Sequence, residues 1–245
     1  STTESSNTSQ HPGVVSSSTE AARPPPPLGF LQEWSVTKEN IEFGSPSRLV
    51  GRVSFEDECA FRTKGCVLIR KLMTDIITLL NGQHDSRSRN MVQRLKDSRI
   101  QIQAGAQVFF HRYFTYRNLA PFAASPADTA DVAAACCFLA CKVEDVELHG
   151  GFVVKALHKD ELPTTGNPPE ETRIRWRDGI FKREVEILKA CCFQFNFQLP
   201  FALLTLKSPL IRAIRNLPVD NKRAMKSFVA MARGIAEDMF STIAW

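Results

Sequence analysis

An uninterrupted apolar stretch runs from Val132 to Cys141, ten residues without a charge. It is too short to cross a membrane, and apolar side chains on every side predict a helix enclosed by other elements. Its four alanines would let neighbouring backbones approach closely. Lys142 ends the stretch, where a cation favours a helix C-terminus, and three acidic residues follow within five positions. We therefore expect a central helix with its charge gathered at one end.

Apolar residues recur at helical spacing before this stretch as well. Ser54, with Asp57 three residues later, predicts a helix start, and Asn81-Gly82 predicts its end. The polar residues 83–90 are interpreted as a loop, followed by a second helix from about Met91 or Asp97 to Arg117. Residues 121–128 are expected to form another loop, with Asp128 or Asp131 capping the central helix.

After the central stretch, Gly150-Gly151 interrupts the pattern, and residues 152–159 predict a short amphipathic helix. A Pro- and Gly-rich loop then leads to a longer helix from Glu170 to about Cys192. Beyond Pro200 the pattern predicts one helix to about Arg215 and another from about 221 to 245. The elements expected along the chain are helices, so the expected fold class is all-α.

The composition shifts near the N-terminus. Residues 1–27 are rich in Ser and Thr and close with four prolines, a composition typical of a disordered tail, although its prolines could also serve as an adaptor ligand. Residues 28–53 carry large apolar side chains, which we expect to pin this extension onto the core. Within it, Ser45-Pro46 is consistent with a loop or with a phosphorylation site.

Composition narrows the function. The net charge of +5 is spread along the chain, so we expect no specific nucleic-acid binding. The seven cysteines lack a Cys-x-x-Cys spacing, which favours buried free thiols in a reducing compartment over a zinc site. His111 has no second ligand at a metal spacing and is interpreted as structural. No catalytic motif is present, so we expect a non-enzyme without metal or cofactor.

The residues at the end of the central stretch carry a resemblance. Phe138-Leu139-Ala140-Cys141-Lys142-Val143-Glu144-Asp145 is similar to the "FLA-x-K-x-E-E/D" signature of the cyclin box. Other segments resemble transcription-type cyclins in the same order along the chain: Trp34, Thr37 and Ile41, the Ser45-Pro46-Ser47-Arg48 turn, and Phe110-His111-Arg112-Tyr113. The resemblance covers roughly residues 34–199.

This resemblance implies the cyclin fold, with one complete five-helix box over residues 54–199. Residues 200–245 would begin a second helical repeat that is incomplete or divergent, since about 45 residues cannot enclose a second core. In cyclins, the lysine that ends the central helix and a glutamate on the fifth helix face the kinase. The matching positions are Lys142 and Glu184, the latter identified by Ile187 and Leu188 after it.

The kinase-binding surface implied by the resemblance also includes Phe138, Leu139 and Glu144. Apolar residues would supply affinity, and the opposite charges would fix orientation. From the residues alone, a plainer arrangement stays open, in which Lys142 caps its helix while Glu184 pairs with Arg183 or Lys189 on the surface.

The implied function is that of a nuclear regulatory subunit that forms a heterodimer with a transcription-type cyclin-dependent kinase and activates it toward the RNA polymerase II tail. Cyclins T and K look most similar, and cyclin L or the fungal tail-kinase cyclin stays open. The substrate-docking "M-R-A-I-L" motif of mitotic cyclins has no counterpart in residues 64–73. Two alternatives are a transcription factor IIB-like protein, although residues 1–50 lack the cysteines of its zinc ribbon, and a non-activating scaffold.

Overall fold

A computed structural model describes residues 42–162, 168–195 and 222–240 of the chain, and regular structure in these ranges is entirely helical. The elements in order are α2 (Pro46–Leu49), α3 (Phe55–Asn81), α4 (Ser86–Asp97), α5 (Arg99–Tyr116), α6 (Ala120–Ala124), α7 (Pro126–Val143), α8 (Gly150–Leu157), the short 3-10 helix η1 (Lys159–Glu161), α9 (Glu170–Ala190) and α11 (Lys222–Met239). The predicted all-α class is confirmed. Nowhere in these ranges is a helix long and apolar enough to span a bilayer.

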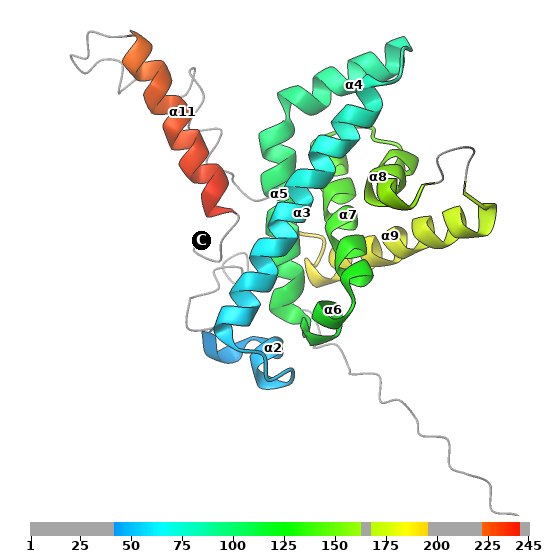
Figure 1. The fold of residues 1–245 in the computed structure, drawn as a ribbon. Coiled ribbons are helices and arrows are strands. Elements are labelled where there is room, and N and C mark those ends of the chain that lie inside the picture. Colours follow the sequence, from blue (N-terminus) through cyan, green and yellow to red (C-terminus); the bar gives the residue numbers. More distant parts are fainter. Residues whose placement is uncertain (1–41, 163–167, 196–221, 241–245) are drawn as a thin grey trace, which may run out of the picture.

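Helix α7 is the centre of the fold (Figure 1). It packs against α3, α5, α8 and α9, and every residue from Val132 to Cys141 is buried. The small alanine side chains allow this close packing on all sides. A similar requirement appears on α3, where a Cβ at Gly65 would lie 2.1 Å from the ring of Phe110. The predicted central helix is therefore confirmed, and the core is formed around it.

The start of α7 differs from the prediction. Its N-cap is Ser125, whose hydroxyl accepts a hydrogen bond from the backbone N–H of Asp128 at 3.4 Å, and Pro126 occupies the first turn. The cap is thus neither Asp128 nor Asp131, and the predicted loop 121–128 contains most of α6. Asp128 instead turns its carboxylate to Arg183 on α9, at 2.6 Å. The Asp128 side chain, which the local pattern assigned to helix capping, forms a long-range ion pair instead.

The predicted loop 83–90 is also wrong, because α4 begins within it at Ser86. Asp85 caps this helix by accepting from the backbone N–H of Ser88 at 2.8 Å. The helix is strongly polar and buries only Ser88, Val92 and Leu95. The predicted second helix is accordingly two helices, α4 and α5, separated at Ser98.

The Ser45–Arg48 turn is built into the core. Ser45 caps α2 and donates its hydroxyl to the buried carboxylate of Glu58 at 2.7 Å. The hydroxyl of Ser47 accepts from the backbone N–H of Leu119 at 3.0 Å. These buried contacts favour a structural turn over a phosphorylation site. Phe43, by contrast, is 66% exposed and does not pin the extension, while Trp34, Thr37 and Ile41 lie outside the described residues.

Two further helices, α8 and α11, also have bounds that differ from the prediction. α8 starts at Gly150, two residues before the predicted start, because His149 Nδ1 accepts the N–H of Gly151 at 3.1 Å. α11 ends earlier than predicted and packs on α5 through Ala236 and Phe240. The predicted helix over 200–215 lies outside the described residues. The division into a box and a second repeat therefore stays a prediction.

Candidate functional site

Lys142 and Glu184, which are 42 residues apart, meet in an ion pair. Lys142 lies in the last turn of α7, and Glu184 lies in the middle of α9, which packs alongside. The Lys142 Nζ donates to Glu184 Oε1 at 2.5 Å. The lysine side chain is 49% exposed and the glutamate side chain 10%. The pair therefore stands at the edge of the core, with its positive member open to solvent.

Aromatic rings pack against this pair on the side that faces the core. Lys142 Nζ lies 4.2 Å from the ring centroid of Phe138, close enough for a cation–π contact. The Phe138 and Phe181 ring centroids are 5.8 Å apart. Gly150, at the start of α8, brings its backbone against Phe181, because a Cβ there would lie 3.4 Å from the ring. Residues of three helices, α7, α8 and α9, thus form the apolar surface against which the lysine lies.

The other predicted site residues take different positions. Phe138 is 6% exposed and Leu139 4%, so both lie within the core. The ring of Phe138 contacts the ion pair, and Leu139 belongs to the hydrophobic core. Glu144 is the C-cap of α7 and is half-buried, and this burial raises the pKa of its carboxyl. The structure therefore brings together Lys142, Glu184 and Phe138, with Glu144 on the same helix end.

Several exposed apolar residues lie around the pair, and the sequence pattern did not assign them to the site. Val143 and Phe181 are each 36% exposed, and Val185 is 49% exposed. Phe181 and Val185 are four residues apart on α9, so they share one side of the helix. The spacing of apolar residues predicts a helix here, but only the structure shows that this side of α9 is partly exposed.

Comparison with known proteins agrees with the resemblance noted in the sequence. No family model matches the chain. Among curated proteins it is similar to cyclin pch1 of Schizosaccharomyces pombe, with 27% identity over 205 residues, which are 82% of this chain and 50% of that protein. This similarity supports the resemblance to cyclins that the motifs carry. It spans about half the length of that relative.

In the structure, the plainer arrangement, with Glu184 paired to Arg183 or Lys189, is not the one adopted. Arg183 pairs with Asp128 at 2.6 Å and with Glu186 at 2.9 Å, rather than with Glu184. Burial would lower the pKa of Arg183, but hydrogen bonds to Glu186 and Asp128 outweigh it and raise the pKa. Arg183 therefore forms ion pairs with other carboxylates, and Glu184 forms its ion pair with Lys142.

His111 is buried, with a relative exposure of 3%. Its Nε2 lies 3.3 Å from Cys66 Sγ and 3.2 Å from the backbone oxygen of Phe240. Burial and the nearby Arg62 lower the pKa of His111 to about 3, so it stays neutral at physiological pH. Burial raises the pKa of Cys66 to about 12, which makes it a poor nucleophile. In the described ranges no three His, Cys, Asp or Glu residues are placed to hold a metal ion.

Proposed function

We propose that this cyclin is the regulatory subunit of a transcription-type cyclin-dependent kinase, which it binds as a heterodimer in the nucleus and activates toward the RNA polymerase II tail. The observation that carries the proposal is the Lys142–Glu184 pair, exposed at the end of the central helix. The transcription type is supported by the Ser45–Arg48 turn and by Phe110-His111-Arg112-Tyr113. The general role of a cyclin as a non-catalytic kinase subunit fits the family.

The pair has hydrogen-bonding capacity beyond its internal contact. An ammonium group has three donors, and Lys142 uses one of them on Glu184. A kinase helix placed across α7 and α9 would meet this partly satisfied pair, with Glu144 beside it. The charges would fix the orientation of that helix more than they add to affinity.

Apolar contact would supply most of the affinity. Val143, Phe181 and Val185 offer exposed apolar surface around the pair, at about 25 cal/mol for each Å² that a partner covers. Phe138 and Leu139 are buried beneath this surface, and their packing fixes its shape. Such a rigid face can shift a mobile kinase helix toward its active position, to the extent that it binds that position better than others.

The decisive experiment measures phosphorylation of a polymerase-tail peptide by a purified transcription-type cyclin-dependent kinase, with and without this cyclin. We expect strong activation by the wild type and at least about a 10-fold loss for Lys142→Glu or Glu184→Lys, since 1.4 kcal/mol corresponds to one decade. The matched control is Lys189→Glu, a charge reversal at an exposed position of α9 that does not contact the pair. It should activate like the wild type.

Three other outcomes distinguish the alternatives. Full activation by both reversal variants would refute the assignment of Lys142 and Glu184. Association without activation across a panel of such kinases would contradict the proposed activating role and favour a non-activating scaffold. Absence of association with every kinase of the panel would leave the family but remove the proposed partner.

A further inference from the structure

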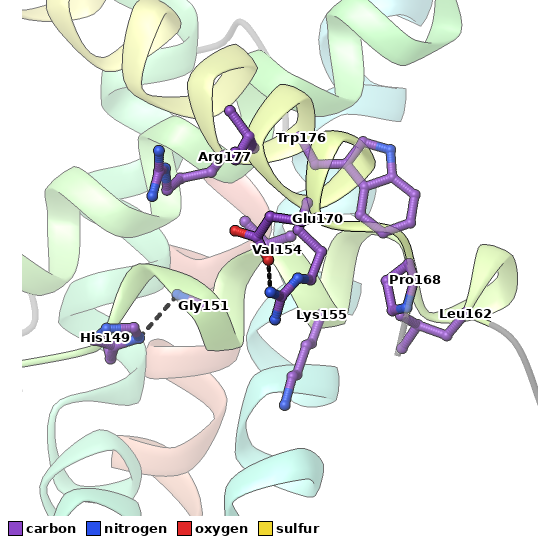
Figure 2. A pocket seen from close by; sticks show the side chains of 11 residues that line it. His149, Gly151, Val154, Lys155, Leu162, Pro168, Glu170, Trp176 and Arg177 are labelled. Atoms are coloured by element: carbon purple, nitrogen blue, oxygen red, sulfur yellow. Dashed lines mark hydrogen bonds and ion pairs between the residues drawn. The ribbon is translucent and has the colours of Figure 1, made fainter. Parts of the chain in front are cut away.

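A second surface feature lies apart from the Lys142–Glu184 pair. A cavity of 560 Å³ opens between α8 and the first half of α9, as Figure 2 shows. α8 contributes Val154 and Lys155, and α9 contributes Arg173, Ile174, Trp176 and Arg177. The volume is in the range of small-ligand and peptide side-chain pockets, about 300–1,000 Å³.

The floor of the cavity is apolar and held in place. Trp176 is 8% exposed, and its ring stacks on that of His158, with centroids 4.1 Å apart and planes 6° from parallel. Val154 is 9% exposed, and Ile174 is 38% exposed. A side chain entering the cavity would therefore meet a preformed apolar surface. Preformation lowers the entropy lost on binding.

The rim of the cavity is basic. Lys155, Arg173 and Arg177 line it, and Glu170 is the acidic residue among the lining side chains. Glu170 forms an ion pair with Arg173, and Arg177 contacts Asp178 at 3.4 Å with 54% of its side chain exposed. Both arginines remain about half exposed, so neither contact saturates the five donors of a guanidinium group.

We propose that this cavity binds an extended acidic peptide segment of a partner protein. One apolar side chain of the segment lies on Val154, Ile174 and Trp176, and its flanking carboxylates pair with the cations of the rim. Charge complementarity selects this occupant: a purely apolar segment would leave the arginines unused, and a small free anion would leave the floor uncovered.

The cavity lies next to the surface proposed for kinase binding. Arg177 is one turn before Phe181 on α9, and Gly151 at the cavity follows Gly150, which packs against Phe181. A bound segment would thus be held beside that surface, which raises the local concentration of its protein there. The peptide binding itself does not depend on the kinase proposal, because it needs only the cyclin chain.

The test uses the full 245-residue chain and a fluorescein-labelled peptide of alternating aspartate and leucine around a central phenylalanine, followed by fluorescence anisotropy. We expect saturable binding that weakens with added salt. Arg177→Glu and the double variant Arg173→Glu with Arg177→Glu should weaken it by about 10-fold or more, with the double variant weaker. Arg175→Glu is the matched control, because this exposed arginine of α9 does not line the cavity and should leave binding unchanged.

Two altered probes separate the two parts of the cavity. The peptide with asparagine for aspartate tests the rim, and the peptide with alanine for phenylalanine tests the floor; each should bind at least about 5-fold more weakly, a difference of about 1 kcal/mol. Circular dichroism and thermal melting establish that every variant is folded. Undetectable binding, equal loss in Arg175→Glu, or equal affinity for the asparagine probe would overturn the proposal. So would preferential displacement of the peptide by single-stranded oligonucleotide.

Discussion

Two ion pairs of this protein have similar contact distances but different surroundings. Glu58 and Arg62, on α3, approach to 2.6 Å with side chains 0% and 2% exposed, whereas Lys142 and Glu184 approach to 2.5 Å with the lysine 49% exposed. Arg62 also donates to the backbone oxygens of His111 at 2.8 Å and Phe114 at 3.0 Å. Glu58 further accepts from Ser45 at 2.7 Å.

The difference in burial and in hydrogen-bond partners indicates the role of each ion pair. In the buried pair, further donors and acceptors are directed to named partners on the N-terminal turn and on α5. A buried charge must be satisfied in this way or it destabilises the fold. Among the described residues, the pair at the end of α7 has no such set of partners, and its lysine is half exposed. The first pair connects segments of the fold, and the second is suited to binding.

The largest expected effect comes from breaking the buried pair. Arg62→Leu should lower the free energy of unfolding by about 3–5 kcal/mol, because it leaves the carboxylate of Glu58 buried without its cation. Urea titration of the wild type and variant measures the loss. The double variant Glu58→Leu with Arg62→Leu removes the stranded charge and should lose less. A single-variant loss below about 1 kcal/mol would contradict the interpretation.

A pH effect of intermediate size should come from His111, whose backbone oxygen binds Arg62. The pKa of the His111 imidazole is about 3 in the folded chain against an ordinary 6.5. Between these pH values the unfolded chain therefore takes up a proton that the folded chain does not. Stability is therefore retained above pH 6.5 and falls as the pH is lowered, by about 2 kcal/mol from pH 7 to pH 5.

His111→Gln should remove this component of the pH dependence. Urea unfolding of wild type and variant at pH 7 and pH 5 isolates it as a difference of differences, which cancels the other titrating groups. An identical pH dependence in both proteins would show that His111 is not held neutral by its surroundings.

The exposed pair should contribute less to stability. Lys142→Met should lower the free energy of unfolding by about 1–2 kcal/mol, less than Arg62→Leu, because the half-exposed lysine is screened by solvent although its loss leaves the mostly buried Glu184 without a cation. It should also reduce kinase activation. Exchanging the charges, Lys142→Glu with Glu184→Lys, should retain the internal pair and the stability without restoring activation. If the exchanged variant activated normally, the pair would matter only for the fold.

The smallest effect is expected at a pair that is exposed on both sides. Arg94 and Asp145 are 3.6 Å apart, with side chains 56% and 97% exposed. Arg94→Ala should shift the free energy of unfolding by no more than about 0.5 kcal/mol and leave kinase activation unchanged. A larger loss would mean that burial is not what separates the two pairs compared above.

The amino-acid sequence determined those elements whose pattern is strong over a long window. The stretch Val132–Cys141 specified a central helix because apolar side chains on all sides can only be satisfied inside a bundle. Ser54 and the apolar face after it likewise specified α3. The positions of Lys142 and Glu184 came from the family motif, and no periodicity would have paired them.

The tertiary structure alone decided the rest, because it depends on which neighbours cover a residue. α4 is polar and was interpreted partly as a loop, yet Val92 and Leu95 fix it to the core. Phe138 and Phe181 are equally apolar in sequence, but α7 is enclosed and buries the first, whereas α9 lies at the edge and exposes the second. The contact between Lys142 and Glu184 joins two helices far apart in sequence. A chain pattern records which side of a helix is apolar, and only packing determines whether that side meets the core or a partner.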